Sequence, residues 1–217
     1  MNIAVIPCRA GSQELPGKNY RDLCGKPLYM WSVEQAAASG CFDHIIVATN
    51  DPMIIKMGAE PHGRIMQRRE IFAGPWVATE AVLLEVIGST PNLNPATDKM
   101  CLLQATSPLR EPGDIRGAMK TEGESVVSVV KNPHIAPNEN RRLMRQERYD
   151  DFVENGAVYW FEIGSFLQGL NRICGDWTMY QMAQWTRHEI DDADDFLIVE
   201  NLMRTHLLKE QASRVPA

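Results

Sequence analysis

The sequence predicts an α/β fold whose central sheet is mostly parallel and doubly wound. Short apolar runs rich in branched residues, each long enough for one strand, alternate along the chain with stretches of helical periodicity. Several of these runs are apolar throughout, as in strands that helices cover on both faces. The 217 residues, 44% of them hydrophobic, suffice for one core, and no internal repeat or long linker divides them. We therefore expect a single domain over residues 1–217.

The first half of the chain contains two clear strand–helix units. Residues 2–7 form an apolar strand, and a helix follows from Pro27 to Gly40, because proline favours the first helical turn and glycine the position after the last. Residues 43–49 form the second strand, and Asn50-Asp51-Pro52 opens the second helix. The further elements expected here are a short strand near 64–66, a helix over 78–87 and a strand over 99–104.

The second half continues this alternation. Pro112 marks the start of a helix, and residues 125–130 form a strand rich in valine. Residues 156–161 return to strand character, and the last helix covers 196–208, with Asp192 as its N-cap.

Residues 131–151 have a different character. They contain prolines, asparagines and four arginines between residues 141 and 148. Such a segment forms a solvated loop, a subunit contact or part of a pocket for an anionic substrate. The residues alone leave these three alternatives open.

Composition excludes several classes of protein. No run approaches the ~18–20 apolar residues of a membrane span, so no membrane association is expected. A net charge of −6 and a pI near 5.4 argue against a nucleic-acid groove, which needs a basic face. The five cysteines lack C-x-x-C spacing, so neither disulfides nor a zinc site is indicated. Because the first strand begins at residue 2, we expect no signal sequence and a cytoplasmic protein.

The loop after the first strand has the residue types that hold polyphosphate. It carries two glycines, whose turns can present backbone N–H groups to phosphate oxygens, together with Arg9, Ser12 and Lys18. Its spacing differs from the P-loop and the dinucleotide fingerprint, which argues against an ATPase or a dehydrogenase. Because ligands of open α/β sheets bind at the carboxyl ends of the strands, we expect the turns at 49–51, 104–110 and 155–156 nearby. An ordinary strand-to-helix connection remains the alternative.

An acidic stretch precedes the last helix. In an extended backbone Glu189 and Asp191 point to the same side and can bind one hard cation through oxygen. An acidic protein that handles polyphosphate needs such a cation to offset charge repulsion. The capping of the last helix explains Asp192, Asp194 and Asp195 equally well.

Taken together and in order, several stretches resemble the acylneuraminate cytidylyltransferase family, the CMP-sialic acid synthetases and relatives acting on other 2-keto sugar acids. The matching stretches are Ile6-Pro7-Cys8-Arg9, Gly11-Ser12, Pro16-Gly17-Lys18-Asn19, Gly25-Lys26-Pro27-Leu28, Phe42-Asp43, Leu102-Leu103-Gln104, Thr106-Ser107-Pro108-Leu109-Arg110, Arg145-Gln146, Asn155-Gly156-Ala157-Val158-Tyr159, Ile190-Asp191 and Asp195-Phe196. The resemblance implies the nucleotide-diphospho-sugar transferase type of fold. It also implies transfer of CMP from CTP to the sugar acid with release of pyrophosphate, Mg²⁺ as cofactor, and a homodimer in which 131–160 is a dimer and active-site segment.

The resemblance also assigns roles to residues. The implied nucleotide-binding residues are Arg9, Ala10, Gly11, Ser12, Lys18, Asn19 and Arg68. The implied substrate-binding residues are Gln104, Arg145, Asn155 and Gly156. Glu189 and Asp191 are the implied metal ligands, and Arg9, Lys18 and Asp191 the implied catalytic residues.

Some positions depart from the family pattern, which implies a divergent member. Gln13 and Glu14 stand where the family usually has lysine and a second basic residue. Val153-Glu154 stands where a basic residue is expected before Asn155. Two alternatives therefore stay open: a related transferase with a different nucleotide or acceptor, and a catalytically impaired homologue that binds nucleotide.

Overall fold

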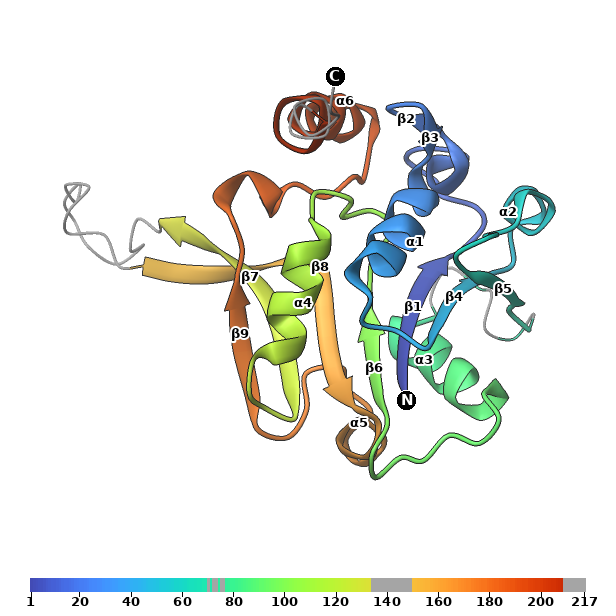
Figure 1. Ribbon diagram of the computed structural model, residues 1–217. Coiled ribbons are helices and arrows are strands. Elements are labelled where there is room, and N and C mark those ends of the chain that lie inside the picture. Colours follow the sequence, from blue (N-terminus) through green and yellow to red (C-terminus); the bar gives the residue numbers. More distant parts are fainter. Residues whose placement is uncertain (70, 72–73, 75–76, 134–149, 209–217) are drawn as a thin grey trace, which may run out of the picture.

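The computed structural model of the protein describes residues 1–69, 71, 74, 77–133 and 150–208. A seven-stranded sheet of order β5-β4-β1-β6-β8-β7-β9 forms its centre (Figure 1). The strands are β1 (Asn2–Cys8), β4 (His44–Thr49), β5 (Arg64–Gln67), β6 (Lys99–Leu102), β7 (Ser125–Pro133), β8 (Asp150–Glu162) and β9 (Trp177–Gln181). Only β8 runs against its neighbours β6 and β7, and the other pairs are parallel. The predicted mostly parallel sheet is confirmed.

Helices cover both faces of this sheet (Figure 1). The α-helices are α1 (Leu28–Ser39), α2 (Pro52–Met57), α3 (Thr79–Ser89), α4 (Pro112–Lys120), α5 (Ile163–Gly169) and α6 (Ala193–Leu202). Alternate residues of β1 enter two different cores: Ala4 and Ile6 join the core that α1 and α4 cover, whereas Ile3 and Val5 join the one that α3 and α5 cover. This alternation is what makes the sheet doubly wound, as predicted.

Most of the predicted boundaries agree with the structure. Gly40 follows α1 in the left-handed conformation, with φ of 66°. Asp51 caps α2 through the backbone N–H of Met53, and Asp192 caps α6 in a reciprocal capping box with Asp195. Helix α6 begins at Ala193, directly after the predicted N-cap Asp192 and three residues ahead of Phe196, where its apolar stripe starts.

Several elements were not predicted. They are the short hairpin β2 (Asp22–Leu23) and β3 (Lys26–Pro27), helix α5, strand β9, and the 3₁₀ helices η1 (Lys18–Tyr20) and η4 (Gln184–Arg187). Helix α5 has only seven residues, and the left-handed position after it is held by Leu170 instead of the usual glycine. Strand β9 lies at the sheet edge with Trp177 and Met179 exposed, so it lacks a buried apolar run.

A third core attaches the last helix to the carboxyl end of the sheet. Residues of α6, among them Phe196 and Val199, pack with Leu15, Leu23 and the fully buried Ile190. Figure 1 shows α6 and the β2–β3 hairpin at the same end of the sheet. This core therefore brings Glu189 and Asp191, which flank Ile190, close to the loop that follows β1.

Within the described residues, no helix combines the length and the apolar character that a bilayer crossing requires.

Arg110 ties the turn after β6 to the neighbouring strand. Its side chain is fully buried, and Nη1 donates to the carbonyls of Gln104 (3.1 Å), Ser107 (2.7 Å) and Ala157 (3.1 Å). Burial lowers the pKa of Arg110 to about 10, so the guanidinium remains charged at neutral pH.

We predict that Arg110→Met lowers the free energy of unfolding by about 3 kcal/mol or more, because it leaves buried carbonyl groups without a donor. Urea unfolding followed by circular dichroism measures this loss. Arg116→Met is the matched control: Arg116 is exposed, bonds the carbonyls of Ala38 and Ser39 at 3.3 and 3.4 Å, and should cost less than about 1 kcal/mol. Equal losses in the two variants would contradict this prediction.

Candidate functional site

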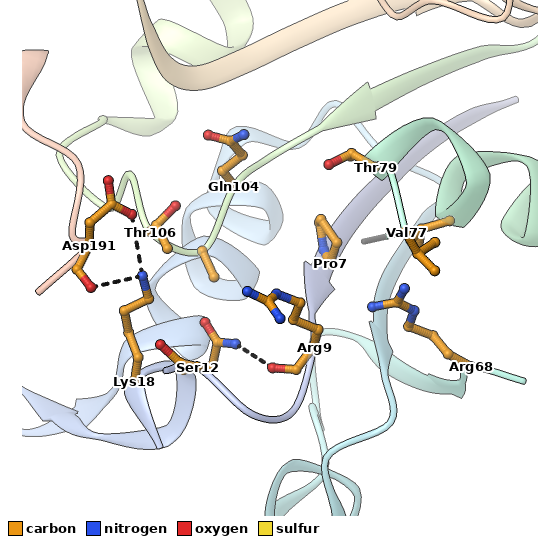
Figure 2. Close-up of a pocket in the computed structure, with 13 residues that line it drawn as sticks. Pro7, Arg9, Ser12, Lys18, Arg68, Val77, Thr79, Gln104, Thr106 and Asp191 are labelled. Atoms are coloured by element: carbon orange, nitrogen blue, oxygen red, sulfur yellow. Dashed lines mark hydrogen bonds and ion pairs between the residues drawn. The ribbon is translucent and has the colours of Figure 1, made fainter. Parts of the chain in front are cut away.

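A pocket opens at the carboxyl ends of β1 and β6 (Figure 2). From β1 the chain continues to β4 on one side, and it later returns to β6 on the other side, so the strand order reverses between β1 and β6. Ligands of open α/β sheets bind at such a reversal. The pocket has a volume of about 270 Å³ and is lined by Pro7, Arg9, Ser12, Lys18, Asn19, Arg68, Val77, Thr79, Val82, Gln104, Ala105, Thr106 and Asp191.

The loop after β1 forms one wall and is fixed by its own hydrogen bonds. The Asn19 amide donates to the Arg9 carbonyl at 3.1 Å, and the backbone N–H of Ala10 donates to Oδ1 of Asn50 at 2.9 Å. Gly17 has a φ of 71°, and a Cβ there would lie 2.6 Å from the Tyr20 ring, so both conformation and space require glycine.

Lys18 joins this loop to the segment before α6. Its Nζ donates to the carbonyl of Ile190 at 2.7 Å and lies 3.5 Å from Oδ1 of Asp191 (Figure 2). The Ile190 N–H in turn donates to the Thr106 carbonyl at 2.8 Å. The segment around Ile190 is therefore held by both loops that line the pocket.

Positive charge is concentrated in the pocket, although the whole chain carries a net charge of −6. Figure 2 shows the guanidinium groups of Arg9 and Arg68 pointing the same way, from the loop after β1 and from the end of β5. Burial lowers the pKa of Arg68, and the charge of Arg9 acts in the same direction. Cations held this close together suit a polyanionic ligand.

The predicted carboxylate pair lies beside Lys18 and Gln104, two residues that line the pocket. Asp191 lines the pocket and is exposed, whereas Glu189 is half-buried. Burial, followed by the charge of Asp191, raises the pKa of Glu189, which places the two carboxylates within electrostatic reach of each other. A Cβ at Gly156, where φ is 66°, would overlap the side-chain ends of both Gln104 and Glu189.

This donor set fits Mg²⁺ bound partly by a ligand. Mg²⁺ is usually held by one or two carboxylates, with phosphate oxygens and water completing its shell. In the part of the chain that the structure describes, no cluster of three or more His, Cys, Asp or Glu residues could enclose a metal alone. Glu189 and Asp191 would therefore hold such an ion together with phosphate.

The structure brings most of the predicted site residues together. Seven of them line the pocket: Arg9, Ser12, Lys18, Asn19, Arg68, Gln104 and Asp191. Ala10 and Gly11 form the loop backbone between Arg9 and Ser12, and Gly156 lies against Gln104 and Glu189. Arg145 falls outside the described residues.

The prediction that Asn155 faces the substrate is wrong. Its side chain is fully buried, with Oδ1 accepting from Ser128 (2.7 Å) and Nδ2 donating to Thr186 (2.9 Å). The pairing of β8 with β7 is irregular here, between Val127 and Val129, so simple strand alternation does not place this side chain. Asn155 therefore contributes to the structure around the pocket and not to its lining.

Sequence reasoning missed the wall that α3 contributes. Val77, Thr79 and Val82 line the pocket, although none of them belongs to a recognisable motif. The start of a helix between two strands of a parallel sheet lies at the ligand-binding edge, and that topological rule could have found Thr79.

Gln13 and Glu14 line an adjoining cavity of about 210 Å³. It shares Arg9, Ser12, Lys18 and Asp191 with the main pocket. The acidic departure from the family pattern therefore borders the same cations.

A pocket at the reversal of the strand order, with several cations and a carboxylate pair, is typical of α/β proteins that bind nucleotides. The chain belongs to the cytidylyltransferase family, whose family model, described as "Cytidylyltransferase", matches residues 3–165.

Three curated relatives are named for sialic acid-type sugars. The CMP-N,N'-diacetyllegionaminic acid synthase of Legionella pneumophila is 34% identical over 58% of this chain and 56% of its own length. The N-acylneuraminate cytidylyltransferase of Oncorhynchus mykiss is 30% identical over 91% of this chain and 49% of its own length. The pseudaminic acid cytidylyltransferase of Campylobacter jejuni is 33% identical over 74% of this chain and 67% of its own length. The chain thus spans about half to two thirds of the length of these relatives.

Solved structures confirm the predicted fold type. A CMP:2-keto-3-deoxy-manno-octonic acid synthetase complexed with CTP superposes with a TM-score of 0.71 at 18% identity, covering 94% of this chain and 98% of that one. A 4-diphosphocytidyl-2C-methyl-D-erythritol synthase superposes with a TM-score of 0.64 at 14% identity, covering 93% of this chain and 98% of that one.

We predict that Lys18→Met weakens binding of CTP by about tenfold or more, because it removes a charge-assisted hydrogen-bond donor and releases the Ile190 carbonyl. Isothermal titration calorimetry measures the affinity. Lys26→Met is the control: Lys26 lies outside the pocket, 4.1 Å from the centre of the Trp31 ring and paired with Glu34. An unchanged affinity in Lys18→Met would show that Lys18 has no part in binding.

Proposed function

We propose that this chain is a nucleotidyltransferase that activates a 2-keto sugar acid of the sialic acid type with CTP, giving a CMP-sugar and pyrophosphate. The observation that carries the proposal is the pocket itself, which Arg9, Lys18 and Arg68 line and in which Lys18 lies beside the carboxylate of Asp191. Membership of the cytidylyltransferase family and the names of its relatives support the choice of nucleotide and acceptor.

In this reaction the anomeric hydroxyl of the sugar acid attacks the α-phosphorus of CTP. A new oxygen–phosphorus bond forms, the bond to the β-phosphate oxygen breaks, and pyrophosphate leaves. Catalysis of this kind consists mainly of positioning and charge neutralisation. Arg9 and Lys18 would neutralise the phosphates, and Ala10, Gly11, Ser12 and Asn19 would shape the loop around them. Arg68 is our candidate for contact with the cytosine.

Glu189 and Asp191 would hold the Mg²⁺, with Asp191 reaching into the pocket. When bound, such an ion offsets the negative charge of the phosphates and of the leaving pyrophosphate. Gln104 and Gly156 would lie at the acceptor end. With its amide nitrogen facing them, Gln104 donates to Oε2 of Glu189 (3.3 Å) and to the Gly156 carbonyl (3.2 Å), so it also positions Glu189.

The direct test is pyrophosphate release by the full chain with CTP, Mg²⁺ and a panel of 2-keto sugar acids. Turnover with at least one acid is expected. Folded protein that releases no pyrophosphate with any of them would refute the proposal. Calorimetry with the four nucleoside triphosphates separates CTP from a different nucleotide, and affinity should be highest for CTP.

We predict that Gly156→Ala lowers turnover by about tenfold or more, because the new methyl group displaces Gln104 and Glu189. Gly40→Ala is a matched control: both glycines have a φ of 66°, but a Cβ at Gly40 has no neighbour within 4 Å. The two variants should therefore lose similar stability, about 1–2 kcal/mol, for placing alanine in the left-handed region. Only Gly156→Ala should lose activity, and a similar loss in Gly40→Ala would contradict the assigned role.

An impaired homologue is the second candidate function, favoured by the position of Glu14 beside the phosphate-binding cations. We predict that Gln13→Lys raises kcat/KM by about fivefold at most, because Gln13 and Glu14 are exposed and water screens their effect. Steady-state kinetics with CTP decide the question. A gain of several orders of magnitude would instead identify a degraded site.

We also propose a homodimer, with 131–160 contributing to the contact. The side chains of Val153, Trp177 and Met179, on β8 and the edge strand β9, are 42%, 52% and 43% exposed, and exposed apolar side chains of this size favour association. We expect a dimer by light scattering at micromolar concentration, and a monomer there would refute it. All five cysteines are free, which supports the predicted cytoplasmic location.

A further inference from the structure

The two ends of the pocket carry charges of opposite sign. Arg9 and Arg68 make the nucleotide end basic, with Lys18 between the ends. The acceptor end, around Gln104 and Gly156, contains Glu189, and a second carboxylate, Glu154, lies on β8 two residues before Gly156.

Glu154 is held in place at this end. It lies on β8 two residues before Gly156, and its Oε2 accepts a hydrogen bond from the Tyr159 hydroxyl at 2.8 Å. The Tyr159 ring also lies 4.7 Å from the Arg172 guanidinium, and Arg172 bonds Glu80, the neighbour of the pocket residue Thr79, so Glu154 is tied to the rim of the pocket. The carboxylate of Glu154 is exposed and therefore open to a ligand.

The nearby cations are already paired with other carboxylates. Lys18 lies 3.5 Å from Asp191, and Arg172 bonds Glu80 at 2.6 Å while its guanidinium lies 4.7 Å from the centre of the Tyr159 ring. Across the described ranges, neither Glu154 nor Glu189 has an ion-pair partner. A divalent cation would neutralise Glu189, which leaves the charge of Glu154 to be met by the acceptor.

We propose that Glu154 is a specificity-determining residue that favours acceptor sugar acids carrying a positively charged amino group. This inference rests on the proposed function. An ammonium group on the acceptor donates a charge-assisted hydrogen bond to Glu154, whereas a neutral acceptor leaves the carboxylate unpaired beside the carboxylate of the sugar acid. The position is one where the family pattern predicts a basic residue, so the reversed charge changes which acceptors are favoured.

The test compares two matched acceptors at pH 7: a sialic acid whose nitrogen carries an aminoacetyl group, and its hydroxyacetyl counterpart, which replaces the amine with a hydroxyl. A second pair carries amine or hydroxyl at carbon 9. We expect kcat/KM for the amine of at least one pair to exceed that of its neutral partner by about threefold to fivefold, as for an exposed ion pair. Glu154→Gln should abolish the preference, and Glu154→Lys should reverse it.

Glu162→Gln is the control, since Glu162 lies at the other end of β8 and pairs with Lys99 at 3.1 Å. It should keep the preference of the unmodified chain. Turnover without a preference for either amine, or a preference that survives in Glu154→Gln, overturns this inference and leaves the proposed function standing. Absence of pyrophosphate with every acceptor overturns both.

Discussion

The pocket depends on one backbone unit, the peptide groups of Ile190. Its carbonyl accepts from Lys18 at 2.7 Å, and its N–H donates to the Thr106 carbonyl at 2.8 Å. Its side chain is fully buried in the core that holds the last helix. Because the side chain is fixed on one side, the neighbouring carboxylates of Glu189 and Asp191 are presented on the other. Direct hydrogen bonds thus join Lys18 to the segment that carries both carboxylates.

Separated charge is the second organising feature. Three cationic side chains line the pocket where the strand order reverses, although the chain as a whole carries a negative charge. The charge of the pocket, and not the net charge of the chain, therefore determines which ligands are attracted. The carboxylates beside these cations repel an anionic ligand unless a further cation accompanies it. In the proposed function, Mg²⁺ and a basic substituent of the acceptor supply that cation.

Local signals predicted the elements that bury an apolar run or carry a standard cap. The valine-rich β7, the Gly40 terminus of α1 and the Asp192 cap of α6 are of this kind. Strand β9 was missed because it is an exposed, alternating edge strand, and helix α5 because it is short and its left-handed C-cap is Leu170 instead of glycine. The resemblance assigned Asn155 to the substrate, but its side chain is fully buried at an irregular pairing of β7 with β8. The bond between Lys18 and Ile190 spans 172 positions, and no local pattern can reveal such a contact.

That long separation also sets an order of assembly. The loop that carries Arg9 and Lys18 follows the first strand, whereas the carboxylate pair lies more than 170 positions further on. Because a domain generally folds as a unit, the two parts of the pocket meet only once nearly the whole chain has been made. Closing so large a loop carries an entropic cost that grows slowly with length. The pocket is therefore complete only when the last helix docks and places the Ile190 segment against the first loop.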